Sequence, residues 1–264
     1  MKLPGRIVTI ALIALVLLCL PLLGLLTRVP WSRLSQVLTS DEATQALLLS
    51  LVTAVCATAL ALVLGVPLAL WLARRTGWMA ASVRTLVLVP MVLPPVVAGL
   101  ALTATLGRRG IIGQPLHDLG LAISFTTAAV VIAQTFVAMP FLVISVEGAL
   151  RATSDRYGVI AATMGATPMR VFWRVTLPLV RPALISGVAL TFARALGEFG
   201  ATLTFAGSLP GTTRTMPLLI YLSREQDQDL AITLALVLIV VAVVIVLTSS
   251  RFMAPAQKSE GSWQ

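Results

Sequence analysis

Residues 161–178 read AATMGATPMRVFWRVTLP, and they differ from the long apolar runs that make up most of the chain. A lipid-facing segment would not combine a glycine, two prolines and two arginines, because charged groups and helix breakers are costly in hydrocarbon. The stretch also lacks the residue combinations typical of catalysis. We therefore interpret it as a connector at the surface of a membrane protein, and its role depends on the side that it faces.

The composition around this stretch is that of an integral membrane protein. Of the 264 residues, 58% are hydrophobic and only 11% are charged, and the mean hydropathy is +0.99. A soluble domain carries about 25% charged residues. Runs of about 18 or more apolar residues predict spanning helices. Six such runs lie at residues 7–26, 43–73, 83–106, 119–146, 183–206 and 230–249. The expected fold class is an all-α polytopic membrane protein with six transmembrane helices.

The first apolar run also has features of a signal peptide, because Lys2 and Arg6 precede it. It continues to Leu26 with no A-x-A cleavage site after it, so we interpret it as a retained helix. The predicted organisation is an N-terminal helix with an external loop (1–42), a core of five spanning helices (43–250) and a short cytoplasmic tail (251–264). The only histidine, His117, excludes a multi-histidine metal site within one chain, and no metal site is expected.

Charge asymmetry between alternate loops predicts the orientation. With the N-terminus in the cytoplasm, twelve basic residues lie inside, six lie outside and Arg194 lies within a span. The inside set is Lys2, Arg6, Arg74, Arg75, Arg84, Arg151, Arg156, Arg170, Arg174, Arg181, Arg251 and Lys258. The outside set is Arg28, Arg33, Arg108, Arg109, Arg214 and Arg224. Both termini and residues 161–178 are therefore expected in the cytoplasm. The net charge of +9 is a topology signal, and we expect no nucleic acid partner.

The connector is expected to be a short helix, a turn and an amphipathic helix. Ala161 and Ala162 leave room for close approach of another element, and Gly165 suits a left-handed helix end. Thr167 and Pro168 are typical of an N-cap followed by a first helical residue. The apolar face of the second helix holds Val171, Phe172, Val175 and Leu179, and its basic face holds Arg170, Arg174 and Arg181. Pro178 and Pro182 are expected to bend the chain back into the membrane. One interpretation is an interfacial helix resting on anionic lipid.

A second interpretation comes from a family resemblance. Ala161-Ala162, Gly165 and Val175-x-Leu177-Pro178 together resemble the "EAA" loop of ABC importer permeases of the type I fold. Two positions depart from that pattern: Ile160 stands where the family usually has Glu, and Val175 where it has Ile. The resemblance implies that the loop at about 155–178 is a coupling helix seated on a cytoplasmic ATPase. The implied ATPase-coupling residues are Ala161, Ala162, Gly165, Thr167, Pro168, Arg170, Leu177 and Pro178.

Two further stretches resemble the molybdate permease subfamily. They are ARALGEFGAT at 193–202 and PGTTRTMP at 210–217. Sulfate permeases are similar but tend to carry Tyr and Ser where this chain has Phe199 and Ala201. The resemblance implies a tetrahedral oxyanion as substrate, most specifically molybdate, with tungstate and sulfate or thiosulfate as alternatives. It also implies a bacterial plasma-membrane protein that forms a homodimer and binds lipid, two ABC ATPase subunits and an external substrate-binding protein.

The chain has no ATP site of its own by sequence. A phosphate-binding loop needs a Gly-rich turn followed by Lys, whereas the two lysines, Lys2 and Lys258, follow Met1 and Gln257. We therefore expect no cofactor in this chain and no enzymatic activity, with ATP and Mg on the partner ATPase. A passive anion channel is a rival hypothesis. An integral-membrane enzyme is another, and it would need convergent titratable groups that the spans lack apart from Arg194 and Glu198.

The fifth apolar run carries both of these charges. Arg194 is 11 residues into the run, about 17 Å along a helix, and Glu198 follows four residues later on the same face. The pair is either a structural element or part of the pathway or gate, with Gly197 and Gly200 allowing close packing or bending. On the outer side, Arg214, Arg108 and Arg109 are candidates for contact with the oxyanion or the binding protein. Ordinary solvated turns are the alternative for Arg108 and Arg109.

Overall fold

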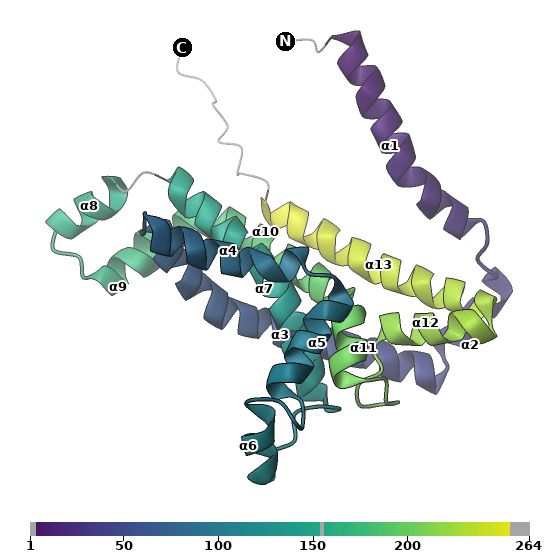
Figure 1. The fold of residues 1–264 in the computed structure, drawn as a ribbon. Coiled ribbons are helices and arrows are strands. Elements are labelled where there is room, and N and C mark those ends of the chain that lie inside the picture. The colour runs from purple at the N-terminus through teal and green to yellow at the C-terminus, as the bar shows by residue number, and fades with distance from the viewer. Residues whose placement is uncertain (1–3, 154–155, 254–264) are drawn as a thin grey trace.

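The computed structural model describes residues 4–153 and 156–253, and every regular element within these ranges is a helix (Figure 1). Five segments are long and apolar enough to cross a membrane: Gly5–Leu26, Asp41–Ala73, Thr127–Ala152, Pro168–Leu196 and Gln228–Thr248. The helices Trp78–Val92 and Pro95–Leu106 form a sixth if this bent pair is counted as one span. The expected all-α, six-span architecture is confirmed.

The long helices are α1 (Gly5–Leu26), α3 (Asp41–Ala73), α7 (Thr127–Ala152), α10 (Leu177–Leu196) and α13 (Gln228–Met253). The bent pair is α4 (Trp78–Val92) and α5 (Pro95–Leu106). The shorter elements are a 3₁₀ turn (Trp31–Arg33), α2 (Leu34–Leu38), α6 (Gly113–Asp118), α8 (Arg156–Thr163), α9 (Pro168–Val171), a π turn (Phe172–Thr176), α11 (Gly200–Ala206) and α12 (Met216–Gln226).

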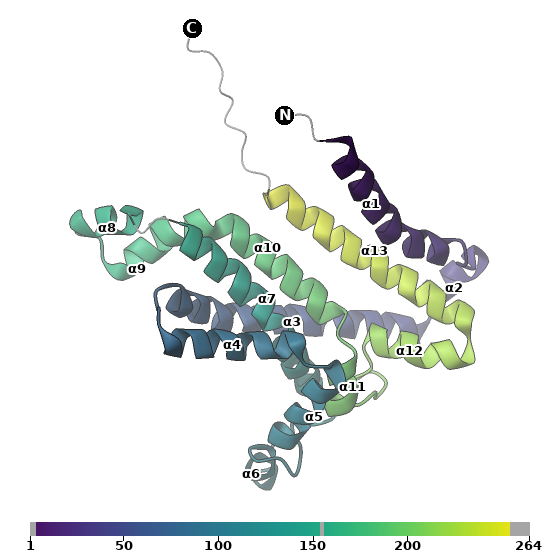
Figure 2. The same cartoon turned by 45° about the horizontal axis from the view of Figure 1, so that its top comes forward.

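Small side chains bring the central helices together. Ala54 and Ala57 of α3, Ala138 of α7 and Ala195 of α10 form one buried cluster, because small residues let helix backbones approach closely. The helices α3 and α7 run parallel: Thr135 bonds the Ala57 carbonyl, and Arg151, further along α7, bonds the Leu72 carbonyl. We call the end where α3 and α7 finish and α10 begins the connector end, because α8 and α9 extend from it (Figure 2).

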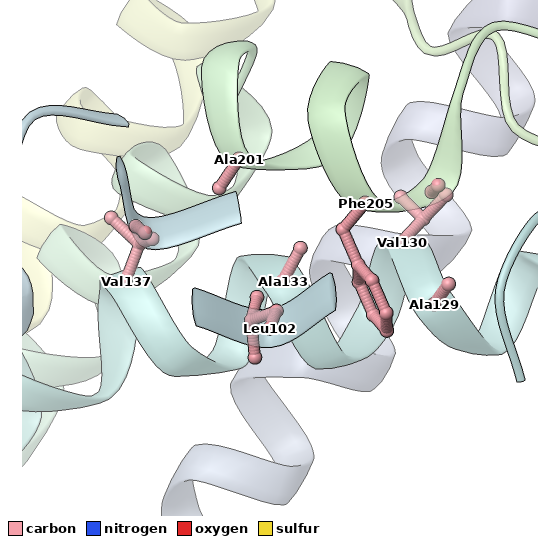
Figure 3. Packing of buried hydrophobic residues seen from close by; sticks show 9 residues of the cluster. Leu102, Ala129, Val130, Ala133, Val137, Ala201 and Phe205 are labelled. Carbon is pink, nitrogen blue, oxygen red and sulfur yellow. The ribbon is translucent and has the colours of Figure 1, made fainter. Parts of the chain in front are cut away.

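A second cluster lies away from the connector end and joins the short helices α5 and α11 to α7. Leu102 of α5, Phe205 of α11 and Val130 of α7 are buried in it (Figure 3). By contrast, α1 stands apart from the other helices, and none of its residues is buried (Figures 1 and 2). A helix of this kind is stable in lipid because its backbone groups bond within the helix.

Three of the six predicted runs need corrected boundaries. The third, 83–106, is broken after Val92, as its prolines Pro90, Pro94 and Pro95 predict, and its halves are bent by 115°. The fourth, 119–146, becomes helical only at Thr127, where Thr126 caps α7, and continues to Ala152. The fifth, 183–206, is interrupted between Leu196 and Gly200. Apolar composition does not mark such breaks, because a buried turn is as apolar as a buried helix.

The predicted tail, 251–264, overlaps α13, which continues to Met253, and residues 254–264 lie outside the described residues. The sequence interpretation also left residues 207–229 as an external loop, whereas Met216–Gln226 forms α12. The division of the chain at residues 42 and 250 stays a prediction.

Candidate functional site

The connector, residues 156–176, turns sharply at Gly165. After α8, the Gly165 N–H donates to the Ala162 carbonyl and the Ala166 N–H donates to the Ala161 carbonyl, at 3.0 Å each. This is the Schellman pattern of a helix end, and it needs a left-handed residue after the last turn. Gly165 has φ +81°, which glycine adopts without the strain that a Cβ would add. The predicted helix end at Gly165 is confirmed.

The next helix starts as the sequence indicated. Thr167 is the N-cap of α9, its hydroxyl accepts a hydrogen bond from the Arg170 N–H at 3.4 Å, and Pro168 occupies the first turn. The two capped ends flank only a short turn, so α8 and α9 are set at a defined angle. Caps of this kind each contribute about 1 kcal/mol.

The predicted bend at Pro178 and Pro182 stays a prediction. The segment Pro168–Leu196 forms one continuous candidate span, with a π turn at Phe172–Thr176 directly before Pro178. In an ordinary α-helix, the proline ring clashes with the carbonyl four residues earlier, here that of Arg174. A wider π turn at this point relieves that clash, so the helix continues from the connector into α10 without a break.

The connector projects from the helix bundle (Figures 1 and 2). It also exposes apolar side chains. Met164 is 83% exposed, and Met169 and Trp173 are also largely exposed. Of the predicted coupling residues, Ala161 and Leu177 are half-buried and the other six are exposed: Ala162, Gly165, Thr167, Pro168, Arg170 and Pro178. Methionine and tryptophan on a protruding element are typical of a protein-binding surface.

A cavity of about 280 Å³ separates part of the connector from the bundle. Tyr157, Val171 and Val175 line it from the connector, and Arg74 and Arg151 line it from the ends of α3 and α7. The connector joins the bundle instead through the π turn, which continues directly into α10.

The break between α10 and α11 is closed by a charged pair. Arg194 Nη1 lies 2.7 Å from Glu198 Oε2, as the four-residue spacing predicted, and Glu198 is 1% exposed. The other carboxylate oxygen of Glu198 accepts the Ala201 N–H at 2.9 Å. Arg194 lies in the last turn of α10, which differs from the expected position within an unbroken span. A cation at this helix end complements the helix dipole.

The two glycines beside this pair have different surroundings. A Cβ on Gly200 would lie 2.5 Å from the Pro95 Cβ, so this glycine lets α11 approach α5. A Cβ on Gly197 would come no closer than 3.5 Å to another group, the Ala193 carbonyl oxygen. Further along, a Cβ on Gly99 of α5 would lie 1.6 Å from the Thr204 hydroxyl oxygen. The broken halves α5 and α11 thus form one tight pair.

The arginines predicted to face outward lie in different environments. Arg214 makes an ion pair with Glu42 at 2.7 Å and a bond to the Ser208 hydroxyl at 3.3 Å, so it anchors its loop to the start of α3. Arg108 lies over the Phe125 ring, 5.8 Å from the centroid. Arg109 is exposed. Within the part of the chain that the structure describes, these three arginines make no hydrogen bond or ion pair with Arg194 or Glu198. Their contact with an oxyanion stays a prediction.

Sequence reasoning missed a second buried carboxylate. Glu147 of α7 is 5% exposed and bonds Arg84 of α4 and Arg151 of α7. The signal was present as one acidic residue at the end of an apolar run, four residues before an arginine. Its partner on α4 could not be read from spacing. Among the described residues, no group of His, Cys, Asp and Glu could hold a metal ion.

Comparison with known proteins agrees with this geometry. Residues 65–254 match the family model described as binding-protein-dependent transport system inner membrane component. The molybdenum transport system permease protein ModB of Mycobacterium tuberculosis is 53% identical over 225 residues, which is 85% of both chains. The protein of that name from Escherichia coli K12 is 40% identical over 183 residues, covering 69% of this chain and 80% of the relative.

Two solved structures share the fold. A bacterial alginate ABC transporter, in complex with its alginate pentasaccharide-bound periplasmic protein, has a TM-score of 0.70 at 19% identity, covering 95% of this chain and 94% of that chain. An inward-facing MetNI methionine ABC transporter has a TM-score of 0.63 at 19% identity, covering 81% and 98%. With the family model spanning most of the chain, this protein belongs to the binding-protein-dependent transport system inner membrane components, the permeases of ABC importers.

Proposed function

We propose that this chain is the membrane subunit of an ATP-driven importer of molybdate. The observation that carries the proposal is the 53% identity, over 85% of both chains, to a molybdenum transport permease. The exposed apolar surface of the connector supports it, because a permease without an ATP site of its own must receive work from another subunit. ATP and Mg would bind to that subunit.

The proposed assembly contains two copies of this chain, two cytoplasmic ATPase subunits and an external binding protein. The connector end faces the cytoplasm, as do both termini, in the plasma membrane of a bacterium. The excess of basic residues on that side supports this orientation. Ala161, Ala162, Gly165, Thr167, Pro168, Arg170, Leu177 and Pro178 belong to the surface that the ATPase contacts.

The residues of this chain suit a two-state mechanical switch. The Schellman turn at Gly165 and the cap at Thr167 make α8 and α9 a stiff unit, so ATPase closure moves them together. This displacement acts on the start of α10, which continues from the connector and packs on α7. The tight α5–α11 pair then moves as one body and opens or closes the path at the Arg194–Glu198 break. Because Arg194 balances the charge of Glu198, the break presents no net negative charge to an anion.

Uptake by vesicles tests the proposal. Vesicles that hold this chain should take up molybdate when the partner ATPase, the binding protein and ATP are all present, and tungstate should compete better than sulfate. A passive channel would take up molybdate without ATP. Sulfate competing as well as tungstate would favour the sulfate alternative, and chemical conversion of the anion would indicate an enzyme.

A matched pair of glycine variants tests the connector. Gly165→Ala puts a Cβ on a left-handed residue, which costs about 1–2 kcal/mol, and should lower ATP-driven uptake. Gly148→Ala, in α7 with open space around its Cβ position, should leave uptake unchanged. Equal uptake by the two variants would contradict a role for a stiff connector.

A further inference from the structure

A single carboxylate oxygen receives hydrogen bonds from two helices at the connector end. Glu147 Oε1 of α7 accepts from Arg84 Nε at 2.9 Å and Arg84 Nη2 at 2.6 Å. It also accepts from Arg151 Nε at 2.8 Å. The Glu147 side chain is only 7% exposed, whereas the side chains of Arg84 and Arg151 are 33% and 43% exposed. Charge-assisted bonds of this geometry are about twice as strong as neutral ones.

Arg151 extends the link to a third helix. Its Nη2 donates to the Leu72 carbonyl at 3.1 Å and to the Arg75 carbonyl at 3.3 Å. These carbonyls lie at the end of α3, where the last turn has no intrahelical partners. Glu147 therefore joins α4, α7 and, through Arg151, α3. We call Arg84, Glu147 and Arg151 the clamp.

The clamp is important for α4 because apolar packing holds this helix weakly. Only Ala80 and Val87 of α4 are buried, and its large apolar side chains at Trp78, Met79, Leu86 and Val92 are largely exposed. In a bilayer, contact between apolar side chains brings little net gain over contact with lipid. Among the described residues, the Arg84–Glu147 contact is the one hydrogen-bonded link between a side chain of α4 and the rest of the bundle.

The clamp also lies between the connector and the broken span. Arg151 lines the cavity that Tyr157, Val171 and Val175 of the connector line from the other side. At its far end, α4 leads through the 115° bend into α5, which packs on α11 beside the Glu198 break. The connector continues into α10, and α10 packs on α7 where Gly187 lies against Leu142. A displacement at the connector can therefore reach the α5–α11 pair by two routes, along α10 itself and from α10 through α7, the clamp and α4.

We propose that Glu147 is a positioning residue that makes α4 move with α7 and α3 when the connector is displaced, so that α5 follows the transport cycle. This inference rests on the proposed function. Without the clamp, α10 and α11 would still respond to ATP hydrolysis, but α4 and α5 would lag behind. The signature is loss of coupling: ATP is hydrolysed with less substrate moved.

Uptake per ATP hydrolysed is the readout that a merely structural role would not change. The assembled transporter is reconstituted with the Glu147→Gln variant, which keeps the shape and removes the charge, and with Arg84→Gln and Arg84→Lys. Coupling energies of this kind correspond to about five-fold or more, so uptake per ATP should fall at least about five-fold in both Gln variants. Arg84→Lys keeps the charge and should recover part of the loss.

Arg75→Gln is the matched control. Arg75 is at the same end of the bundle, but its guanidinium lies over the Trp71 ring at 6.0 Å, and its contact with Arg151 uses only the backbone carbonyl. This variant should keep wild-type uptake per ATP. If Arg75→Gln lowers uptake per ATP as much as Glu147→Gln does, removal of any charge at this end of the bundle lowers the coupling. That result would overturn the inference.

A reversible crosslink tests the mechanical claim separately. Arg84→Cys and Glu147→Cys are combined in a chain whose Cys19 and Cys56 are replaced by Ala. A short bis-methanethiosulfonate linker should restore uptake per ATP, and reduction should remove it again. No rescue after complete crosslinking would overturn the clamp. If the wild-type transporter shows no ATP-driven molybdate uptake, the proposed function fails. If it does, and Glu147→Gln transports equally well per ATP, only the clamp fails.

Discussion

The α4–α5 break and the α10–α11 break of this protein depend on different chemistry. The α4–α5 break lies at Leu93-Pro94-Pro95, and the two halves are bent by 115°. The ring of a proline and its missing N–H interrupt the hydrogen bonds of a helix, so the two adjacent prolines predict this break from the local sequence. The α10–α11 break, Gly197 to Phe199, has no proline and is closed by Arg194, Glu198 and the Ala201 N–H.

This difference has consequences for stability and for motion. The proline break needs no charged partner, although a single proline is not enough to break a helix here, since Pro21, Pro67 and Pro140 lie within continuous helices. A charged break depends on two side chains finding each other in a buried site, and removing one leaves the other unpaired. We therefore expect the α10–α11 break to change its conformation when the ion pair is disturbed, whereas the α4–α5 break should keep its conformation.

The largest expected effect is at the charged break. Glu198→Gln leaves Arg194 without its counter-ion, which should lower the free energy of unfolding by about 3 kcal/mol and reduce uptake, while the protein still reaches the membrane. Thermal unfolding in nanodiscs and uptake at matched expression measure these changes. Glu225→Gln, at an exposed position of α12, is the control and should behave as wild type. Wild-type uptake by Glu198→Gln would count against a working role for the pair.

The contact between the two breaks comes next. Gly200→Ala places a Cβ 2.5 Å from the Pro95 Cβ, and such overpacking costs about 1–3 kcal/mol. Gly197→Ala meets nothing closer than 3.5 Å and should change stability by less than about 0.5 kcal/mol. Thermal unfolding of the two variants compares them directly. If both are equally destabilised, the close approach of α11 to α5 is not what Gly200 provides.

A smaller effect is expected at the proline break. Pro94→Ala leaves Pro95 in the first turn of α5 and removes no buried charge. The substitution mainly increases the conformational entropy of the unfolded chain, which should lower the free energy of unfolding by about 0.4–1 kcal/mol. Chemical unfolding of the reconstituted protein measures the change. A loss as large as that of Glu198→Gln would show that the two breaks are held in the same way.

The smallest effect is at an exposed junction, between α12 and α13. Asp227 Oδ1 accepts the Leu230 N–H at 3.1 Å, and Arg33 lies 3.1 Å from its other oxygen. The backbone N–H of Leu230, followed by the charge of Arg33, lowers the pKa of Asp227.

The sign of the pH dependence follows from this direction. The lowered pKa means that Asp227 stabilises the fold above its unfolded pKa of about 3.9 and that this contribution is lost as the pH falls through the lower folded value. Between about pH 5 and about pH 3, the melting temperature of the wild type should therefore fall slightly more than that of Asp227→Asn. Identical pH profiles of the melting temperature would contradict this, and the exposure of the pair explains why the effect is small.

Much of the fold was predictable because the signals are local. Apolar runs gave the number of spans, and Gly165 with Thr167 gave the turn of the connector, since caps and left-handed residues depend on their immediate neighbours. The Arg194–Glu198 pair followed from four-residue spacing. The break beside it was not predictable, because Leu196 to Gly200 is as compatible with helix as with a turn until α5 packs against it.

The amino-acid sequence by itself determined that this is a helical membrane protein with a capped, protruding connector, because hydrophobic length and helix-end chemistry act over a few residues. Only the tertiary structure decided which distant charges meet: Arg84 with Glu147, and Arg214 with Glu42, which are 63 and 172 positions apart. The physical reason is that helix periodicity sets the face on which a side chain lies, whereas its partner is set by the packing of whole helices.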